Sequence, residues 1–400
     1  MSITVAEVYK LPTLKNVKIL TGKSGFQNQV DRMGILDYEF ISYKMQGEFI
    51  KNDFVLSSLL FAKDDINLMS AAVKTLIDNG VSLLGIKDIY YQELPADLLQ
   101  YAVEKDFSIF LFSHDAYFED IITDVTDTLR LIDRDQLIEM KVDNLIGNEL
   151  SRSLVRELAL DINPVFRESC CAIFCRPGSH AEEGVLFRTL ERLRRLEYFR
   201  SENSVFRYKN GFIAVLTTGS AAEILDDSRP EIRNASQTPR QILTAFLTQT
   251  GLLPEEYYMG VSDCFSQLHY LDKAVQQSLF SCSVCRLENR HTVFYSEIGL
   301  YRVILPYLHD YWLSDYCKSI VEPIRQYDEK YSADLFHTAA VYVQNDGSVK
   351  QTAAALFQHE NTVRYRIGKI RELMGMEKDS AGFYPQLCIA VLTSQLEYYL

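Results

Sequence analysis

The spacing of apolar residues changes along this 400-residue chain, and each spacing allows only certain folds. From residue 53 to residue 112, short apolar runs alternate with stretches in which apolar residues recur every three or four positions. The runs are typical of buried strands and the stretches of amphipathic helices. Strands that alternate with helices predict an α/β domain with a largely parallel sheet. Asn79-Gly80 closes the first of these helices, because both residue types tolerate the left-handed conformation of a helix stop.

Residues 117–160 contain Gly147 but no other glycine and no proline, and their apolar residues recur at intervals of three, four and seven. This spacing predicts one or two amphipathic helices that join the first domain to the next. Packing against a neighbouring domain and an intermolecular coiled coil both fit the pattern. We favour packing because the heptads do not persist.

A second succession of strands and helices starts near residue 170 and predicts the order β-α-β-β-α-β, which is that of a ferredoxin-like sheet. The expected strands are at 171–175, 204–208, 212–216, 258–261 and 292–295, and the expected helices are at 185–199, 240–249, 267–279 and 300–312. Lys209-Asn210-Gly211 predicts a hairpin, because Asn and Gly accept the positive φ of a tight turn. Polar residues 226–239 predict a surface loop.

The last eighty residues predict helices throughout. Ser348 precedes a short helix, a break follows at 357–359, and a second helix runs from about Glu360 to Met374. The apolar stripe of this second helix consists of Val363, Ile367, Ile370 and Met374. Its opposite face and flanks consist of Asn361, Thr362, Arg364, Tyr365, Arg366, Gly368, Lys369 and Arg371. Two short helices joined by a three-residue turn, the second basic on its outer face, are typical of a helix-turn-helix.

Charge distinguishes this region from the rest of the chain. The net charge of −13 argues against a protein coated in positive charge for nonspecific binding to nucleic acid or anionic membrane. Between Val349 and Lys378, however, six basic residues accompany three acidic ones, which gives a local charge of +3. The pattern alone leaves two interpretations, a DNA reader and a packing module with a solvated basic face.

The residue string TAAALFQHENTVRYRIGKIRELMG, residues 352–375, resembles the C-terminal helix-turn-helix of the PucR family of bacterial transcriptional regulators. The positions that match the family pattern are Ala353, Leu356, His359, Asn361, Thr362, Val363, Tyr365, Arg366, Leu373 and Gly375. Glu360 departs from that pattern, since many relatives have an uncharged or basic residue there. Its carboxylate lowers the positive potential at the start of the helix.

The resemblance extends to two further segments. ITVAEVYKLPTLKNVKILTGKSGFQNQVDRMGILD resembles the opening of the family's N-terminal domain, and the likeness continues over about the first 125 residues. GVSDCFSQLHYLDKAVQQSLF and VFYSEIGLYRVI resemble the middle domain of such regulators, a relative of the diguanylate-cyclase sheet. The resemblance therefore implies a three-domain fold. It comprises an N-terminal α/β sensory domain at 1–125, a helical connector at 126–164, a middle α+β ferredoxin-like, degenerate GGDEF-like domain at 165–315 and an all-α helix-turn-helix domain at 320–400.

The same resemblance implies a transcriptional regulator, often an activator, that responds to a small-molecule effector. The expected targets are genes of nitrogen or carbon catabolism, with purine breakdown the case that names the family and a purine-catabolic metabolite as the candidate effector. A single reading helix contacts few base pairs, so specific binding to double-stranded operator DNA requires a dimer or higher homo-oligomer. We expect the middle domain and the helices around residues 129–160 to hold the copies together.

The residues expected to bind DNA are His359, Asn361, Thr362, Arg364, Tyr365, Arg366 and Lys369. Arg364 can address guanine and Asn361 adenine by paired hydrogen bonds, although Asn361 can instead cap the helix and hold a phosphate. Arg366 and Lys369, displaced around the helix, are expected to bind phosphate without reading sequence.

The rival function is a nucleotide-processing enzyme of the diguanylate-cyclase type with an accessory helical domain. Active cyclases carry acidic residues on a glycine-rich hairpin that helps to hold divalent metal. The corresponding hairpin, residues 208–212, has no acidic residue, and Lys209 repels a metal ion. We therefore expect no enzyme activity, no catalytic residue, no metal and no cofactor.

Cysteine spacing raises the separate question of zinc or redox chemistry. Cys282-x-x-Cys285 is one paired motif, and Cys170, Cys171 and Cys175 form a looser group. A structural zinc site needs four ligands at characteristic spacings, and no second paired motif exists. We therefore favour core or surface thiols.

The candidate effector site is predicted at the carboxyl ends of the strands in the first domain. In an open α/β sheet, small ligands bind beyond the carboxyl ends of the strands. Ser57, Ser58, Lys87 and His114 follow three of the expected strands and are the candidate ligand-binding residues. The alternative is that they are ordinary loop residues.

The sequence shows neither a signal-peptide pattern nor a long apolar run, which bears on the expected cellular compartment. Its first twenty residues have no basic start followed by an apolar stretch, and no run of about 18 apolar residues occurs. The eight cysteines lie mostly in apolar strings, as reduced thiols do. We expect a cytoplasmic protein without a membrane partner.

Overall fold

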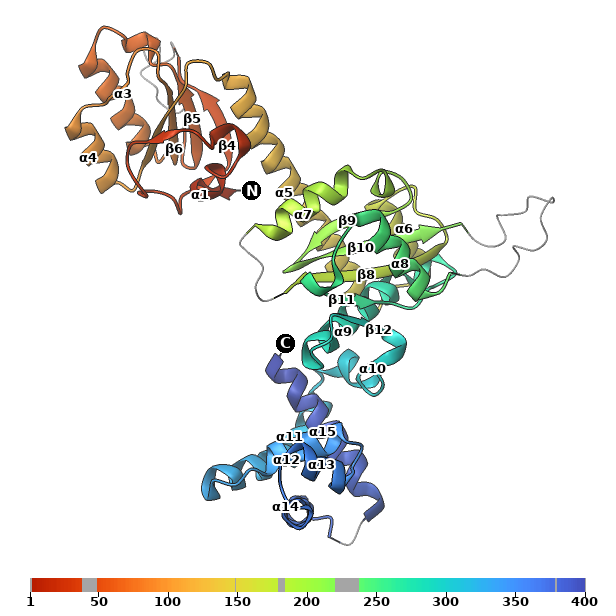
Figure 1. Ribbon diagram of the computed structural model, residues 1–400. Coiled ribbons are helices and arrows are strands. Elements are labelled where there is room, and N and C mark those ends of the chain that lie inside the picture. Colours follow the sequence, from red (N-terminus) through yellow and green to blue (C-terminus); the bar gives the residue numbers. More distant parts are fainter. Residues whose placement is uncertain are drawn as a thin grey trace, which may run out of the picture. The chain divides into compact units, whose positions relative to one another are not determined.

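The computed structural model describes residues 2–37, 49–147, 149–178, 184–219, 237–377 and 380–399. The chain separates into two compact units, residues 1–137 and 138–400 (Figure 1). Most of the surface loop predicted at 226–239 lies outside the described residues.

A five-stranded sheet is the centre of the first unit. Its strands are β2 (Lys18–Ile19), β4 (Arg32–Ile35), β5 (Asp53–Ser57), β6 (Leu83–Lys87) and β7 (Ser108–Phe112), in the order β2-β7-β6-β5-β4. Strands β4 to β7 pair in parallel and β2 pairs antiparallel with β7. A second, two-stranded sheet consists of β1 (Ile3–Thr4) and β3 (Gln29–Val30). The prediction of a largely parallel α/β sheet is confirmed.

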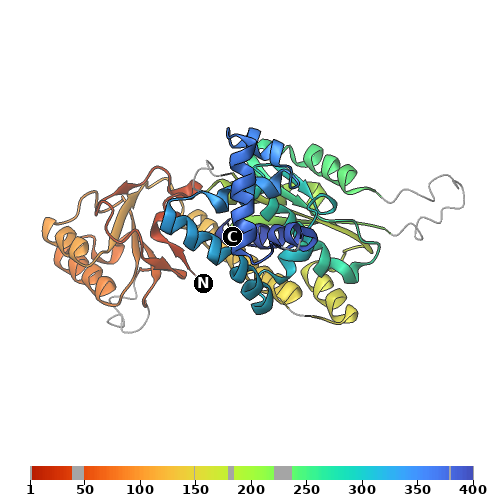
Figure 2. The same ribbon diagram turned by 90° about the horizontal axis from the view of Figure 1, so that it is seen from below.

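Helices α3 (Ile66–Asp78) and α4 (Ala96–Glu104) lie where the spacing predicts them. The unit also contains α1 (Val5–Val8) and the 3-10 turns η1 (Pro12–Leu14) and η2 (Leu60–Ala62). Helix α3 begins after Asp65, whose carboxylate accepts two backbone N–H groups at 3.0 Å, and it stops before Gly80, whose φ is +80°. Helices α3 and α4 lie side by side (Figures 1 and 2).

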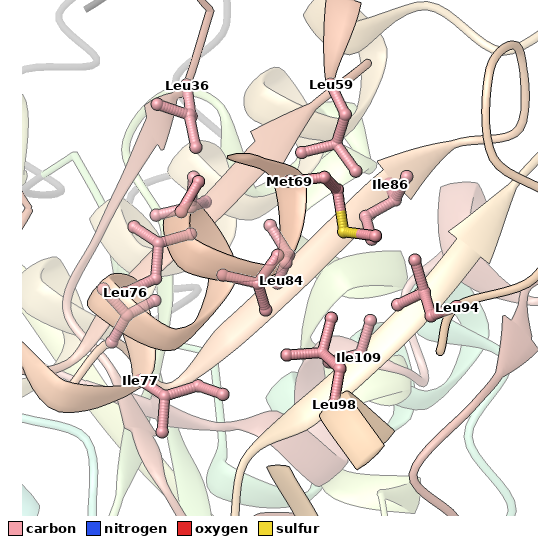
Figure 3. Packing of buried hydrophobic residues seen from close by; sticks show 14 of the residues in the cluster. Leu36, Leu59, Met69, Leu76, Ile77, Leu84, Ile86, Leu94, Leu98 and Ile109 are labelled. Carbon is pink, nitrogen blue, oxygen red and sulfur yellow. The ribbon is translucent and has the colours of Figure 1, made fainter. Parts of the chain in front are cut away.

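The core of the first unit is packed between these helices and the sheet (Figure 3). Met69 and Leu76 of α3 and Leu98 of α4 are fully buried against Leu84 of β6 and Ile109 of β7. Each such side chain stabilises the fold by about 1.5–3 kcal/mol relative to an exposed one.

Two helices occupy the predicted connecting region, α5 (Phe118–Gly147) and α6 (Arg152–Ile162). In the first unit, the buried residues of α5 are Ile121, Val125 and Leu129. In the second unit, the buried residues of α5 and α6 are Val142, Leu145, Val155 and Ala159. The preferred interpretation, packing against a domain, is therefore confirmed for both ends of α5.

The second unit contains a mixed sheet. Its strands are β8 (Ser169–Pro177), β9 (Ser204–Tyr208), β10 (Gly211–Thr218), β11 (Tyr257–Val261) and β12 (Thr292–Phe294), in the order β12-β11-β8-β10-β9. The pairs among β8 to β11 are antiparallel and β12 pairs in parallel with β11. The helices are α7 (Val185–Arg195), α8 (Pro239–Thr250) and α9 (Leu271–Leu287), with the 3-10 turns η3 (Glu197–Phe199), η5 (Pro254–Glu256) and η6 (Leu268–Tyr270). The predicted β-α-β-β-α-β order is confirmed.

Alternating side chains of this sheet enter two cores. Ile213 and Val215 of β10 pack with α6 and α9, whereas Ala214 and Leu216 pack with α7 and α8. Figure 1 shows α7 and α8 over the face of the sheet that is turned to the viewer.

The hairpin between β9 and β10 forms as predicted, but for another reason. The residue with positive φ is Lys209, at +48°. Gly211 is needed because a Cβ there would lie 2.4 Å from the carbonyl oxygen of Cys175. Our explanation, in which the glycine relieves the turn, is wrong: it relieves a close approach between strands.

The prediction of a single apolar helix at 300–312 is also wrong. The segment forms α10 (Tyr301–Ile304) and the 3-10 turn η8 (Leu305–Tyr307), and a new helix, α11, begins at Tyr311. Asp310 separates η8 from α11. Its carboxylate is the N-cap of α11, where it accepts the backbone N–H groups of Trp312 (2.9 Å) and Leu313 (3.2 Å). A further 3-10 turn, η7 (Tyr295–Glu297), precedes α10.

From residue 311 the described chain is helical, as predicted. The helices are α11 (Tyr311–Tyr331), α12 (Leu335–Gln344), α13 (Val349–Ala355), α14 (Glu360–Leu373) and α15 (Ser380–Tyr399). They share one apolar core, to which α14 contributes through its buried stripe. Among the described residues, none of these or the other helices has the length and apolar character that crossing a membrane requires.

Candidate nucleic-acid interface

Helices α13 and α14 form a helix-turn-helix whose ends are defined by side-chain caps. The Ser348 hydroxyl accepts the backbone N–H of Gln351 at 3.3 Å and starts α13. In the turn, Phe357 has a φ of +53°. The His359 Nδ1 accepts the backbone N–H of Asn361 at 3.1 Å and starts α14. His359 therefore has a structural role in addition to the DNA contact that the sequence predicts for it.

One stripe of α14 is buried, as predicted. Val363 and Ile370 are fully buried and Ile367 is 6% exposed, whereas Met374, at the end of the helix, is only half-buried. This stripe packs with residues of α12 and α15. Burial of the stripe turns the opposite side of the helix toward solvent.

The exposed side of α14 presents Arg364, Tyr365 and Gly368. Tyr365 is 71% exposed. The Arg364 guanidinium donates to Glu360 Oε2 at 2.9 Å and to Asn361 Oδ1 at 3.2 Å. The two groups expected to read bases are therefore joined by a hydrogen bond, and Glu360 binds the same guanidinium.

The flanking cations are bound inside the domain. Arg366 is 23% exposed and donates to Thr338 Oγ1 (2.9 Å) and Asp334 Oδ2 (3.3 Å), both at the start of α12. Lys369 is 22% exposed, donates to Glu372 Oε1 at 2.8 Å and lies 5.1 Å from the Tyr327 ring centroid. These contacts fix α14 against α11 and α12.

The position of Arg371 differs from the one that the sequence predicts. The helical pattern predicts it on the outer face, but its guanidinium lies over the Phe383 ring of α15, 4.6 Å from the ring centroid. A cation over an aromatic face gains electrostatic energy that an exposed cation lacks. The spacing missed this because Phe383 lies on another helix.

A hollow of about 550 Å³ opens between α13 and the start of α14. The polar residues that line it are Lys350, Gln358, His359, Glu360, Asn361 and Arg364. The start of a helix also carries a partial positive charge and unpaired N–H groups, which favour phosphate. The sequence analysis did not include Lys350 among the candidate DNA-binding residues, because its charge alone does not distinguish it from any other exposed lysine. In the structure, Lys350 lines the same hollow as Arg364, which marks it as a candidate.

Two stretches of the chain match known families. Residues 7–129 match the purine catabolism regulatory protein-like family, and residues 335–392 match the PucR C-terminal helix-turn-helix domain. Both stretches are domains of the PucR family. The second match extends from α12 into α15, so the helix-turn-helix of this chain lies within the family's C-terminal domain.

Two curated relatives come from Bacillus subtilis (strain 168). The proline-responsive transcriptional activator PutR is 25% identical over 146 residues, which are 36% of this chain and 35% of that protein. The purine catabolism regulatory protein is 24% identical over 109 residues, which are 27% of this chain and 20% of that protein. The matched part thus spans about a third and a fifth of these relatives.

One solved structure is also similar. It is the crystal structure of a regulator of polyketide synthase expression from Bifidobacterium adolescentis, with 18% identity and a TM-score of 0.31. The match covers 66% of this chain and 99% of that chain.

The candidate effector residues of the first unit separate into two groups. Ser57 is fully buried, where its hydroxyl donates to the Leu36 carbonyl (2.7 Å) and accepts the Leu59 N–H (2.9 Å). Ser58 Oγ accepts the Leu60 N–H at 3.3 Å. Both hydroxyls support the backbone after β5.

Lys87 and His114 lie at the carboxyl ends of the adjacent strands β6 and β7, where Lys87 pairs in register with Phe112. The Lys87 ammonium is 5.9 Å from the Tyr117 ring centroid. His114 is 66% exposed, with Nδ1 3.5 Å from Asp88 Oδ1. The structure brings these two groups to one edge of the sheet, together with Asp88, which directly follows β6.

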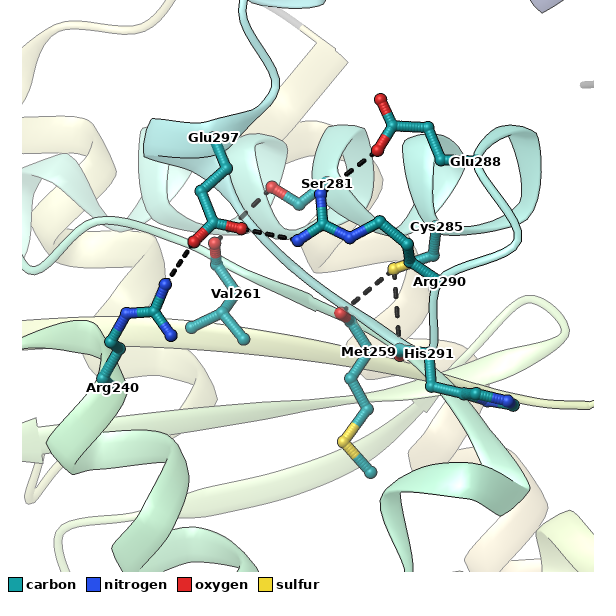
Figure 4. Close-up of polar contacts among 9 residues, drawn as sticks. All are labelled: Arg240, Met259, Val261, Ser281, Cys285, Glu288, Arg290, His291 and Glu297. Carbon is teal, nitrogen blue, oxygen red and sulfur yellow. Dashed lines mark hydrogen bonds and ion pairs between the residues drawn. The ribbon is translucent and has the colours of Figure 1, made fainter. Parts of the chain in front are cut away.

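The paired motif Cys282-x-x-Cys285 consists of two buried thiols. Cys285 is buried and its Sγ donates to the Met259 carbonyl at 3.2 Å (Figure 4). Beside it, Arg290 pairs with Glu288 (3.2 Å) and Glu297 (2.8 Å). Among the described residues, no three His, Cys, Asp or Glu side chains are grouped as metal ligands would be.

Proposed function

We propose that this chain is a small-molecule-responsive transcriptional regulator that binds double-stranded operator DNA through α13 and α14. The observation behind this proposal is the exposed face at the start of α14, where Arg364 and Tyr365 project beside the hollow. An α-helix fits the DNA major groove, and Gly368 has no side chain to hold the helix away from it. Both curated relatives are named as regulators, which supports the same class.

Within this interface, Arg364 and Asn361 read bases. Arginine addresses guanine and asparagine adenine through two hydrogen bonds each, which contribute about 1–3 kcal/mol of discrimination. Lys350, exposed on α13 across the hollow, binds phosphate. Tyr365, Thr362 and His359 complete the predicted contact surface.

Arg366 and Lys369 act differently from the phosphate contacts that the sequence predicts. Because Arg366 is held by Thr338 and Asp334, and Lys369 by Glu372 and Tyr327, neither is free to reach DNA without losing a contact inside the domain. We infer that both position α14 and that Lys350 supplies the phosphate contact.

The first unit senses the effector at the carboxyl edge of its sheet. Lys87, His114 and Asp88 offer a cation, an imidazole and a carboxylate, which suit a compact polar metabolite. We propose control of nitrogen or carbon catabolism genes in the cytoplasm, with purine-catabolic intermediates as the first ligands to test. Proline, which names one relative, is the matched alternative.

The middle sheet is a ferredoxin-like, degenerate GGDEF-like domain without catalysis. Its strand order β11-β8-β10-β9 supports this assignment. At the hairpin where a cyclase holds metal, the Lys209 ammonium pairs with Asp143 of α5 at 3.5 Å, and Tyr208 donates to the same carboxylate at 2.7 Å. Incubation with GTP and Mg²⁺ or Mn²⁺ should produce no cyclic dinucleotide; a product would favour the enzyme alternative.

A second copy of the chain completes the DNA reader. The buried apolar residues of α5 and α6 lie inside the units, and their exposed large apolar residues are Leu137, Met140 and Leu154. More exposed apolar side chains lie in the segment 300–316, which includes the start of α11, so we place the contact between copies there. The exposed large apolar side chains of this segment are Leu300, Val303, Tyr307, Tyr311, Trp312 and Tyr316. Aromatic residues are typical of interface centres.

The test is selection of DNA from a random pool with the full chain, followed by titration of the selected duplex and a scrambled one. A specific regulator binds its operator about a thousandfold or more tighter than unrelated DNA. Equal affinity for the two duplexes across a salt series would refute sequence reading by α14.

A further inference from the structure

One cysteine differs from the other seven. Cys264 is half-buried, whereas the rest are buried. Burial raises the pKa of Cys170 and Cys282 to about 12, and it also raises the pKa of Cys175, Cys285, Cys317 and Cys388. The pKa of Cys264 is lowered, because the Cys171 thiol donates a hydrogen bond to its sulfur, while that bond and burial raise the pKa of Cys171. The thiolate is the reactive form, so partial exposure and a lowered pKa both favour reaction at Cys264.

The backbone explains why these two thiols meet. Beyond the end of β11, the Ser262 N–H donates to the Ala172 carbonyl at 3.0 Å. Three residues later, Phe265 exchanges two backbone hydrogen bonds with Cys170, at 2.8 and 2.9 Å. One residue therefore separates the paired positions on β8, whereas two residues separate them on the opposite segment. This arrangement is a β-bulge.

Cys171 is the single residue on β8, and it faces Asp263 and Cys264 across the bulge. Residues directly opposite in antiparallel strands have Cα atoms about 4.5–5.5 Å apart, which falls within the range of about 4.4–6.8 Å that disulfides span. Ser262 Oγ lies 3.5 Å from Cys171 Sγ and donates to it, which holds the Cys171 side chain in place.

We propose that Cys264 and Cys171 are an oxidant-responsive thiol pair, in which a hydroperoxide oxidises Cys264 and Cys171 then closes a disulfide. The Cys264 thiolate attacks one peroxide oxygen, the O–O bond breaks, and the leaving hydroxide takes a proton from solvent to form water. The Cys171 sulfur then attacks the sulfenic sulfur, the S–O bond breaks, and the departing hydroxide takes the Cys171 proton. Two thiols and one H₂O₂ give one disulfide and two waters, so both electrons reduce the peroxide.

The disulfide ties β8 to the segment that leads into α9. Cys282 and Cys285, three residues apart on α9, provide an internal comparison. Both are buried, and the Cys285 thiol donates to the Met259 carbonyl (Figure 4). Buried thiols with raised pKa react slowly, so these two are expected to remain reduced.

The test is treatment of the full chain with a small excess of H₂O₂ at neutral pH, followed by alkylation, digestion and mass spectrometry. We expect loss of two thiols, one linked peptide pair containing residues 171 and 264, and full reversal by dithiothreitol. Cys264→Ser should lower the rate of thiol loss about tenfold or more. Cys285→Ser is the matched control and should form the same linked pair as the unaltered chain.

Cys171→Ser separates the two steps, since Cys264 should then stop at the sulfenic acid and be labelled by dimedone. Thermal melts verify that each variant is folded; because Cys264 is half-buried, its serine variant tests the proposal even if the Cys171 variant is unfolded. Oxidation of Cys282 or Cys285 before Cys264, or thiol loss from Cys264→Ser at the unaltered rate, would overturn the proposal.

Discussion

Replacing Glu360 by glutamine should tighten DNA binding. In the free protein the Glu360 carboxylate accepts from Arg364 at 2.9 Å, and the two side chains are 40% and 61% exposed. An exposed i,i+4 pair of this kind is worth about 0.3–0.5 kcal/mol, which DNA binding must overcome. Repulsion between the carboxylate and a phosphate about 8 Å away in water adds about 0.5 kcal/mol. The sum of about 1 kcal/mol predicts about fivefold tighter binding for Glu360→Gln.

The assay is fluorescence anisotropy of a labelled operator duplex at several salt concentrations, because screening should reduce the gain at high salt. The matched control is Glu372→Gln, which removes the same charge from the pair with Lys369. Twelve residues of helix place Glu372 about 18 Å further along α14, beyond a Debye length, so its effect should be within about twofold. The Glu360 variant should also lose about 0.5 kcal/mol of stability, since a carboxylate favours the start of a helix. Binding that is unchanged or weaker in Glu360→Gln than in the control would refute the proposed place of α14 on DNA.

The remaining predictions concern both units. Arg364→Ala should relax base preference at one position per half-site, whereas Lys350→Ala should weaken all sequences alike and reduce the salt slope by about one unit; competition titrations distinguish the two. A purine-catabolic ligand at a hundredfold excess over Kd should stabilise the chain by about 2.7 kcal/mol in a thermal melt, and Lys87→Ala should abolish the shift. Burial raises the pKa of Tyr9 to about 12, so the stability that its neutral form contributes is complete below pH 10 and is lost between pH 10 and 12. In Tyr9→Phe, the free energy of unfolding should fall less steeply between pH 10 and 12, by up to about 1.4 kcal/mol per pH unit; chemical denaturation at several pH values measures this slope. Trp312, the only tryptophan of the chain, is 75% exposed, so its emission should shift to shorter wavelength as dimers form on concentration; a concentration-independent spectrum would exclude it from the contact.

Local signals in the sequence predicted most of the secondary structure. Ser348 and Gly80 act within a few residues of their own position, so the sequence alone locates the helix ends that they form. The stretch at 300–312 is the exception. There the apolar spacing continued past Asp310, and the cap that divides the helix was not recognised.

What the sequence by itself determined is which side of each element faces the core. The spacing of Val363, Ile367 and Ile370 implies a buried stripe, because helical geometry alone sets the direction of each side chain around the axis. The same geometry placed Arg364 and Tyr365 in solvent. The direction of each side chain around the axis is a property of this one helix.

Only the tertiary structure decided what each outward side chain meets. Arg366 finds Asp334 and Thr338 on α12, and Arg371 finds Phe383 on α15, so two cations predicted on the open face or its flank are bound inside the domain. The Cys171–Cys264 pair depends on a bulge that joins positions more than ninety residues apart. Periodicity records direction within one element, whereas such partners come from elements brought close by packing, and a single sequence holds no signal for that proximity.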